Sequence, residues 1–337
     1  HVALLVAAGA TPAAALRVCV ACHGFSSTTP AVLAARLGYL TTELSLDAAG
    51  IGRLLARWPR AVDCDPKTAL APRLAYFRRL GLGGEDLARL ALRAPALLGG
   101  PSLRTVIMPR VAALRALLPL PPPDLTRLIA RCPTVLLASD GAVAERVGFL
   151  TDDPAGPRLT PAQLARAVAA HPPLLEYAVP AVADRVSFLR DAVGLDAASL
   201  ADVVARAPTL LSLDVARNLA PKWAFLTSRL GGGPKTVARC PVVLTLSLGR
   251  RIAPRVAFLE AARAQPGGRA VKLKDPFPVS PYLTWSDVMF AERGVRVPLA
   301  EWVAFRDAHV AAAEERDGGK MGAVPVESAP VVATAAA

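Results

Sequence analysis

A proline-centred string that recurs about every 36 residues is the feature that most constrains how this chain can fold. Successive copies are separated by 36, 38, 39, 36 and 33 residues. The aligned prolines are Pro59, Pro95, Pro133, Pro172, Pro208 and Pro241. An earlier copy carries His23 in place of the proline. Self-similarity at this period is typical of a repeat array, in which each unit buries its apolar face against its neighbours.

The residues before each proline predict a first helix in every repeat. Leu200, Val203 and Val204 show the i, i+3, i+4 spacing of one helix face. The proline disfavours helical geometry in the preceding residue, so the helix should end there. Capping chemistry is expected at its start, from a Thr-x-x-Gln box with proline at the first helical position and from aspartates. These residues are Thr160, Pro161, Gln163, Asp47, Asp124 and Asp196.

A second helix is expected after two apolar residues that follow the proline. It carries another recurring string, such as Pro-Arg-Val-Ala-Phe-Leu at residues 254–259. Each copy keeps a basic residue 13 to 15 positions after the proline or its equivalent. These residues, called here the string column, are Arg36, Arg73, Arg110, Arg146, Arg185, Lys222 and Arg255.

The frame of the repeats sets the expected domains. Residues 1–265 are predicted to form the repeat solenoid, with a degenerate first copy and a shortened last one. Residues 266–281 are rich in proline, glycine and lysine and read as a linker. Residues 282–315 are predicted to form a helical cap, and residues 316–337 a disordered tail. The overall expectation is an all-α solenoid of about seven repeats with a C-terminal capping element.

Charge narrows the class of partner. The 337 residues carry a formal net charge of +12, which favours nucleic acid or a membrane surface. No run of about 20 apolar residues is present to span a bilayer. The five cysteines are an odd number, and reduced thiols are expected. The chain begins at His1, so a targeting segment would precede it.

The two alternating strings resemble those of the mitochondrial transcription termination factor (mTERF) family. The resemblance covers residues 16–259, and the last copy, at residues 240–261, is especially similar. The segment at residues 282–295 is similar to the ends of plant and algal members. His23, Ala170 and the short last repeat depart from the pattern.

The resemblance implies a fold and a function. The fold would be a curved superhelix of triangular repeats, each with two α-helices and a short third helical turn. A basic groove would hold nucleic acid. Members of the family act in mitochondria or chloroplasts, on transcription termination or other gene expression, and some act on RNA.

Two basic columns are candidates for phosphate contact. The first is the string column. The second, the pre-proline column, lies two residues before the proline and comprises Arg57, Arg93, Arg131, Arg206 and Arg239. Residues at one repeat position line up on one face of a solenoid, where they would meet phosphates at intervals. Alternatively, these side chains cap helix carbonyls or pair with acids of the next repeat. No repeating code of polar base-reading residues is visible.

Other chemistry is disfavoured. Cys19, Cys22 and His23 match the C-x-x-C-H site for haem attachment, but Cys132 and Cys240 occupy the same repeat position as Cys22. The four histidines are scattered, and no carboxylates are paired as acid and base. We therefore expect no catalysis, no cofactor and no metal.

The sequence thus predicts an organellar protein, mitochondrial or chloroplast, that binds double-stranded DNA and terminates or regulates transcription. It is expected to be a monomer that does not enter a membrane. Organelle RNA is the alternative target, for transcript processing or splicing. A third hypothesis is a helical-repeat scaffold for protein partners, in which the arginines are structural.

Overall fold

The computed structural model describes residues 1–22, 28–139, 141–264 and 282–316. No strand occurs among these residues, which confirms the predicted all-α class. The chain divides into two compact units. Unit 1 comprises residues 1–147 and 168–176, and unit 2 comprises the described part of residues 148–167 and 177–337. His23, the predicted linker and the predicted tail beyond residue 316 lie outside the described residues.

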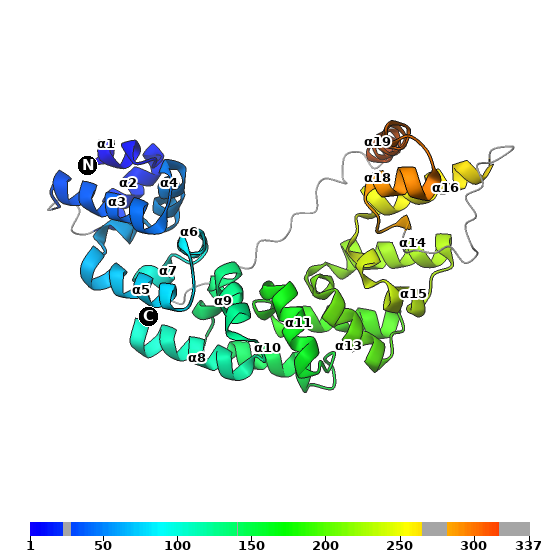
Figure 1. The fold of residues 1–337 in the computed structure, drawn as a ribbon, viewed down its shortest axis with the longest axis horizontal. Coiled ribbons are helices and arrows are strands. Elements are labelled where there is room, and N and C mark those ends of the chain that lie inside the picture. Colours follow the sequence, from blue (N-terminus) through cyan, green and yellow to red (C-terminus); the bar gives the residue numbers. More distant parts are fainter. Residues whose placement is uncertain (23–27, 140, 265–281, 317–337) are drawn as a thin grey trace. The chain divides into compact units, whose positions relative to one another are not determined.

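The described helices follow the repeat frame, and Figure 1 shows them in chain order. The first element is α1 (Val2–Ala7). The first helices of the repeats are α2 (Pro12–Ala21), α4 (Ala48–Arg57), α6 (Gly84–Arg93), α9 (Pro122–Arg131), α11 (Pro161–Ala170), α13 (Ala197–Arg206) and α15 (Pro234–Arg239). The short turns that follow the prolines are η1 (Pro59–Asp63), α7 (Ala96–Gly99), η4 (Pro133–Leu137), η5 (Pro172–Leu175), η7 (Pro208–Ser212) and η9 (Pro241–Thr245).

The second helices are longer and several have two parts. They are α3 (Pro30–Leu44), η2 (Pro66–Leu70) with α5 (Ala71–Arg79), η3 (Leu103–Ile107) with α8 (Met108–Leu117), α10 (Ala142–Thr151), α12 (Val179–Ser187) with η6 (Phe188–Ala192), η8 (Val215–Leu219) with α14 (Ala220–Leu230), and η10 (Leu248–Ile252) with α16 (Ala253–Ala264). The C-terminal elements are α18 (Asp287–Met289), η11 (Phe290–Val295) and α19 (Leu299–Arg316).

The first helix ends where the proline predicts. In all six copies with a proline, its last residue lies two positions before that proline, as Arg206 does before Pro208. The residue between them leaves helical geometry, because a following proline disfavours the helical region. Ala207, for example, has φ −137° and ψ 62°.

Most of the predicted caps are also confirmed. The Thr160 amide donates to Gln163 Oε1 at 3.0 Å, and the Gln163 amide donates to Thr160 Oγ1 at 3.3 Å. Asp47 and Asp196 cap α4 and α13. Asp124 does not cap α9, because Pro121 precedes the helix and Asp124 lies within its first turn, where it pairs with Arg127.

The turn after the proline is held by buried apolar pairs. Leu97 with Leu98, Leu174 with Leu175, and Leu210 with Leu211 are each at most 1% exposed. These side chains place the backbone carbonyls of the turn close to the preceding repeat.

Proline also shapes the second helix in four repeats. Where proline stands directly before the string residue, the helix begins with a wide π-helical turn. An amide there bonds to the carbonyl five residues earlier, as Leu219 does to Asp214 at 3.0 Å. A proline ring clashes with the carbonyl four residues back and cannot donate, and the wider turn relieves this conflict. Glu145 and Asp184 replace the proline in the other two repeats of this region, and α10 and α12 begin as ordinary α-helices.

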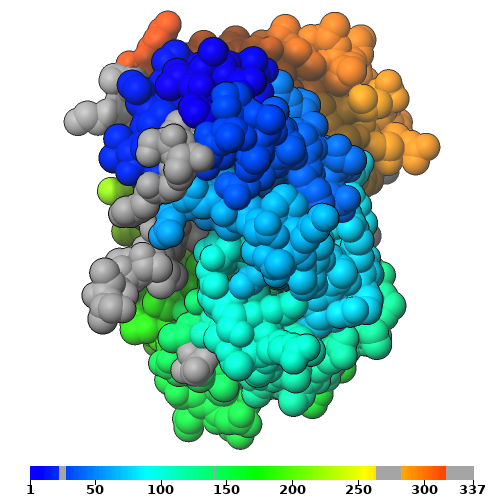
Figure 2. All heavy atoms as spheres, turned by 90° about the vertical axis from the view of Figure 1, so that its left-hand side faces the viewer, coloured from blue at the N-terminus to red at the C-terminus, as the bar shows by residue number. Residues whose placement is uncertain are grey.

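In unit 1 the repeats stack in direct contact, coloured dark blue to cyan in Figure 2. A close backbone approach joins α4 to the turn after α1. A Cβ on Gly52 would lie 2.1 Å from the Gly9 carbonyl oxygen, so only glycine fits at this crossing. Gly9 itself has φ +104°.

Candidate nucleic-acid interface

The string column points inward and joins each repeat to the next. Its side chains are half-buried or buried, and the six members before Arg255 each donate to a backbone carbonyl in the turn after the next aligned proline. The bonds within unit 1 are Arg36 to Val62 at 2.7 Å, Arg73 to Leu97 at 2.8 Å, Arg110 to Leu136 at 2.9 Å and Arg146 to Leu175 at 2.7 Å. Those in unit 2 are Arg185 to Leu213 at 3.0 Å and Lys222 to Leu244 at 2.8 Å. The column therefore has internal partners, and we leave its members out of the candidate interface.

Two members of this column are fully buried. Lys222 is 5% exposed and Arg255 is 0% exposed. Burial lowers the pKa of Lys222 to about 8, because the charged form loses its hydration. Lys222 also donates to Asn218 Oδ1.

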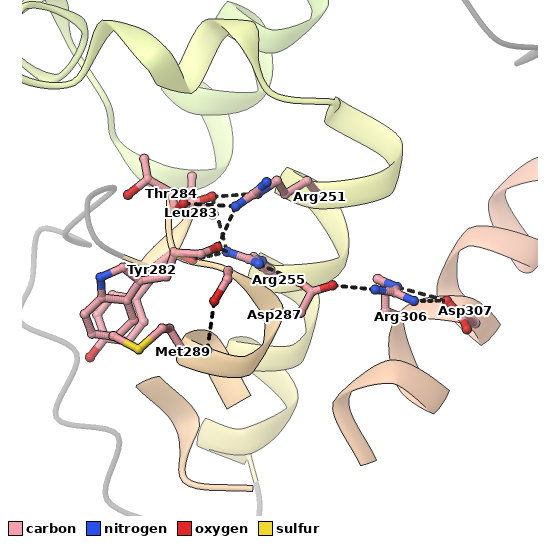
Figure 3. Close-up of polar contacts among 11 residues, drawn as sticks. Arg251, Arg255, Tyr282, Leu283, Thr284, Asp287, Met289, Arg306 and Asp307 are labelled. Carbon is pink, nitrogen blue, oxygen red and sulfur yellow. Dashed lines mark hydrogen bonds and ion pairs between the residues drawn. The ribbon is translucent and has the colours of Figure 1, made fainter. Parts of the chain in front are cut away.

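The C-terminal elements stand where a further repeat would follow, and Arg255 contacts them there (Figure 3). Its guanidinium donates to the carbonyls of Tyr282 at 2.8 Å and Trp285 at 2.7 Å, and pairs with Asp287 at 2.6 Å. It also lies 4.7 Å from the centroid of the Phe290 ring. The segment after residue 281 thus supplies Arg255 with acceptor carbonyls. In the other repeats, the turn after the aligned proline supplies them to the string residue.

Asp287 is shared by two arginines. Arg306 pairs with its other carboxylate oxygen, and Figure 3 shows the three side chains in a row. Burial would raise the pKa of Asp287, but the hydrogen bonds and positive charges, chiefly those of Arg255, hold it below its usual value. Beside this group, Phe258, Phe290 and Trp302 form an apolar core between α16 and the C-terminal elements.

The pre-proline column behaves differently, because all five of its arginines are exposed. Each is the last residue of a first helix. Arg93 donates to the carbonyl of Arg131 at 2.6 Å, and Arg131 donates to that of Ala169 at 3.1 Å. In unit 2, Arg206 donates to the carbonyl of Ala238 and pairs with Asp202 at 3.0 Å. Arg57 and Arg239 make no side-chain hydrogen bond or ion pair within the described residues.

A second basic column, exposed except for the half-buried Arg89, accompanies the first and was missed by the sequence analysis. It lies four residues earlier on the same helices, so its side chains share a face with the pre-proline column. Its members are Arg17, Arg53, Arg89, Arg127, Arg166 and Lys235. Only α13 breaks it, with Asp202. The i, i+4 spacing of basic residues was the signal that could have found it.

Unit 1 gathers both columns around one open cleft between α6 and α9. The cleft has a volume of about 1050 Å³ and is lined by five arginines and one acid. The charged residues are Arg79, Arg89, Arg93, Arg127, Arg131 and Asp86. Arg89 pairs with Asp86 at 2.7 Å, and Arg127 pairs with Asp124 at 2.6 Å. His171 also lines it, and burial with the nearby Arg131 charge lowers the pKa of this imidazole.

Two of the cysteines are buried at the same position of the repeat, directly before the proline or its equivalent. All five are free thiols. Cys22 and Cys132 are each 3% exposed, and the Cys22 thiol donates to the Pro59 carbonyl at 3.4 Å. Burial raises the pKa of Cys22 to about 12, so its thiol stays protonated. In the described part of the chain, no three His, Cys, Asp or Glu side chains are grouped to hold a metal ion.

The described helices are short or polar relative to a bilayer-spanning helix. None of them has both the length and the apolar character needed to cross a membrane.

Comparison with known proteins identifies the repeat. A family model described as mTERF matches residues 104–291, more than half of the chain. A search of curated proteins found no match. The matched segment includes the repeat frame, the string column from Arg110 onward and the start of the C-terminal elements. The chain therefore belongs to the mTERF family of nucleic-acid-binding helical-repeat proteins.

Proposed function

We propose that this protein binds double-stranded DNA in a mitochondrion or chloroplast, where it terminates or regulates transcription without catalysing a reaction. The observation that carries this proposal is the pair of exposed basic columns on successive first helices. Arginine and lysine side chains at regular intervals neutralise phosphates and release counterions, which gives affinity without sequence readout.

The structure of the columns supports phosphate contact in a specific way. The inward string column already has carbonyl partners, whereas the two outward columns keep donors facing solvent. The RNA backbone carries the same phosphate charge, so RNA is the second candidate target and belongs in the same test.

The test is the salt dependence of binding to a DNA duplex and to single-stranded RNA of the same sequence. The variant is Arg57→Gln with Arg239→Gln, which removes two column charges that have no internal partner. The control is Arg104→Gln with Arg115→Gln, which removes two exposed charges from second helices. The column variant should flatten the slope of log affinity against log salt by about two, since each phosphate contact contributes about 0.9.

The outcomes separate the hypotheses. A flatter slope for the duplex in the column variant alone supports DNA, and the same change with tighter RNA binding moves the function to transcripts. Equal slopes in both variants, or no binding to either probe, would reject the interface and favour a scaffold for protein partners.

A further inference from the structure

The cleft between α6 and α9 has features that are not needed for contact between the two basic columns and successive phosphates. We propose that it is a discrete site for a nucleoside triphosphate group, supplied either by a free nucleotide or by the 5′ end of a transcript. This inference goes beyond the proposed function and does not depend on it.

Four of the five arginines of the cleft have intramolecular partners before any ligand arrives. Arg89 and Arg127 are each fixed by a carboxylate three residues earlier on the same helix. Arg93 and Arg131 are each fixed by a carbonyl at the end of the next first helix. A guanidinium carries five donors, so each retains others for a ligand. Side chains already ordered in this way lose less entropy when they bind phosphate.

The charge of the lining matches a compact polyphosphate. Five arginines and one aspartate line the cleft, so the lining carries four net positive charges. A triphosphate bears about four negative charges near neutral pH, since its terminal phosphate is nearly doubly ionised. Arginine binds such oxygens in bidentate geometry, which favours closely spaced phosphates.

Apolar lining provides room for the nucleoside. Leu80, Pro122, Pro123 and Pro173 contribute apolar surface beside the arginines. The volume of about 1050 Å³ is near the upper end for small-molecule sites. The cleft therefore combines a charged wall for phosphates with apolar surface for a base and sugar.

Arg79 distinguishes this cleft from the equivalent places in the other repeats. It lies six residues after its string residue, and the corresponding positions in the other repeats lack a basic residue. They are occupied by Thr42, Ala116, Asp152, Asp191, Ser228 and Ala261. Repeating phosphate contact would not require a single extra arginine here, whereas one compact site would.

The experiment measures binding of ATP, of adenosine and of two RNA oligonucleotides that differ only in a 5′-triphosphate or 5′-hydroxyl end. The full chain is compared with Arg89→Gln plus Arg127→Gln. The matched control is Arg104→Gln plus Arg115→Gln, which removes the same charge from exposed positions outside the cleft and outside both basic columns. Denaturation curves show whether each variant is folded.

We expect one ATP per chain, no binding of adenosine, and at least about a tenfold loss of ATP affinity in the cleft variant, since charged hydrogen bonds are lost. The control should stay within about twofold. If only the triphosphate RNA shows this pattern, the ligand is a transcript end; if ATP shows it, a free nucleotide also binds.

Two results would overturn the site. One is equal loss in the cleft variant and the control, or several ATP molecules per chain, which indicates diffuse attraction to a basic surface. The other is no ATP binding together with equal affinity for the two RNA ends. That second result leaves the proposed nucleic-acid binding intact, because the oligonucleotides would still bind through the columns.

Discussion

At the scale of single residues, the string position shows how one contact can be made by different side chains. Six copies use arginine and one uses Lys222, yet each reaches a backbone carbonyl of the segment that follows its repeat. Lysine has a compact charge whose pKa shifts readily on burial, whereas arginine stays protonated. The same contact is therefore sensitive to pH in only one repeat.

This difference predicts how stability changes with pH. The pKa of Lys222 is about 8 in the folded chain, against about 10.4 for lysine in an unfolded one. Between these values the unfolded chain holds a proton that the folded chain has released, so rising pH favours folding. Relative to Lys222→Arg, the wild type should gain unfolding free energy from about pH 8 to about pH 10. Denaturant titrations at each pH measure this, and a constant difference would contradict it.

Several residue-level features followed from the sequence because their causes are local. Pro208 ends α13 through its own ring, and Thr160 with Gln163 caps α11 through side chains three residues apart. The direction of Arg110 could not be predicted, because its acceptor at Leu136 lies in another repeat. The column that contains Arg127 was open to prediction from i, i+4 spacing. That members of this column gather around a cleft could not be predicted, because it depends on how α6 and α9 pack.

At the scale of elements, close packing of α4 on the turn after α1 depends on missing side chains. A Cβ on Gly52 would lie 2.1 Å from a backbone oxygen that no rotamer change can move away. A Cβ on Gly38, in the interior of α3, would meet nothing within 4 Å. A side chain at position 52 would therefore overlap the backbone, whereas position 38 has open space for one.

The contrast gives a matched pair of substitutions. Gly52→Ala should destabilise the protein by about 1–3 kcal/mol, because the backbone must shift to relieve the overlap. Gly38→Ala should stabilise it by about 0.5–1 kcal/mol, because alanine loses less conformational freedom in a helix. Thermal or denaturant unfolding measures both, and a stabilising Gly52→Ala would show that α4 does not approach this turn so closely.

At the scale of the whole molecule, the contacts made by the string and pre-proline residues are short in range along the chain. The string and pre-proline bonds join residues between 22 and 38 positions apart, which is one repeat. Arg255 continues this pattern into the C-terminal elements, whose acceptors lie 27 to 32 positions away. Stability in such an array is a sum of repeats and nearest-neighbour contacts, so damage at one end should stay there.

Asp287→Asn tests this locality. The substitution leaves the buried Arg255 charge without its counter-charge and should cost about 2 kcal/mol, less than the 3–5 typical of a fully buried pair because Asp287 is partly exposed. Amide hydrogen exchange should speed up in α16, η11 and α19, and stay unchanged in unit 1. Asp307→Asn is the control, since it removes an equal charge that pairs with Arg306 and not with Arg255. Faster exchange in unit 1 would show that the Arg255–Asp287 pair stabilises more than its neighbouring elements. Equal effects of the two variants would show that this pair has no special role.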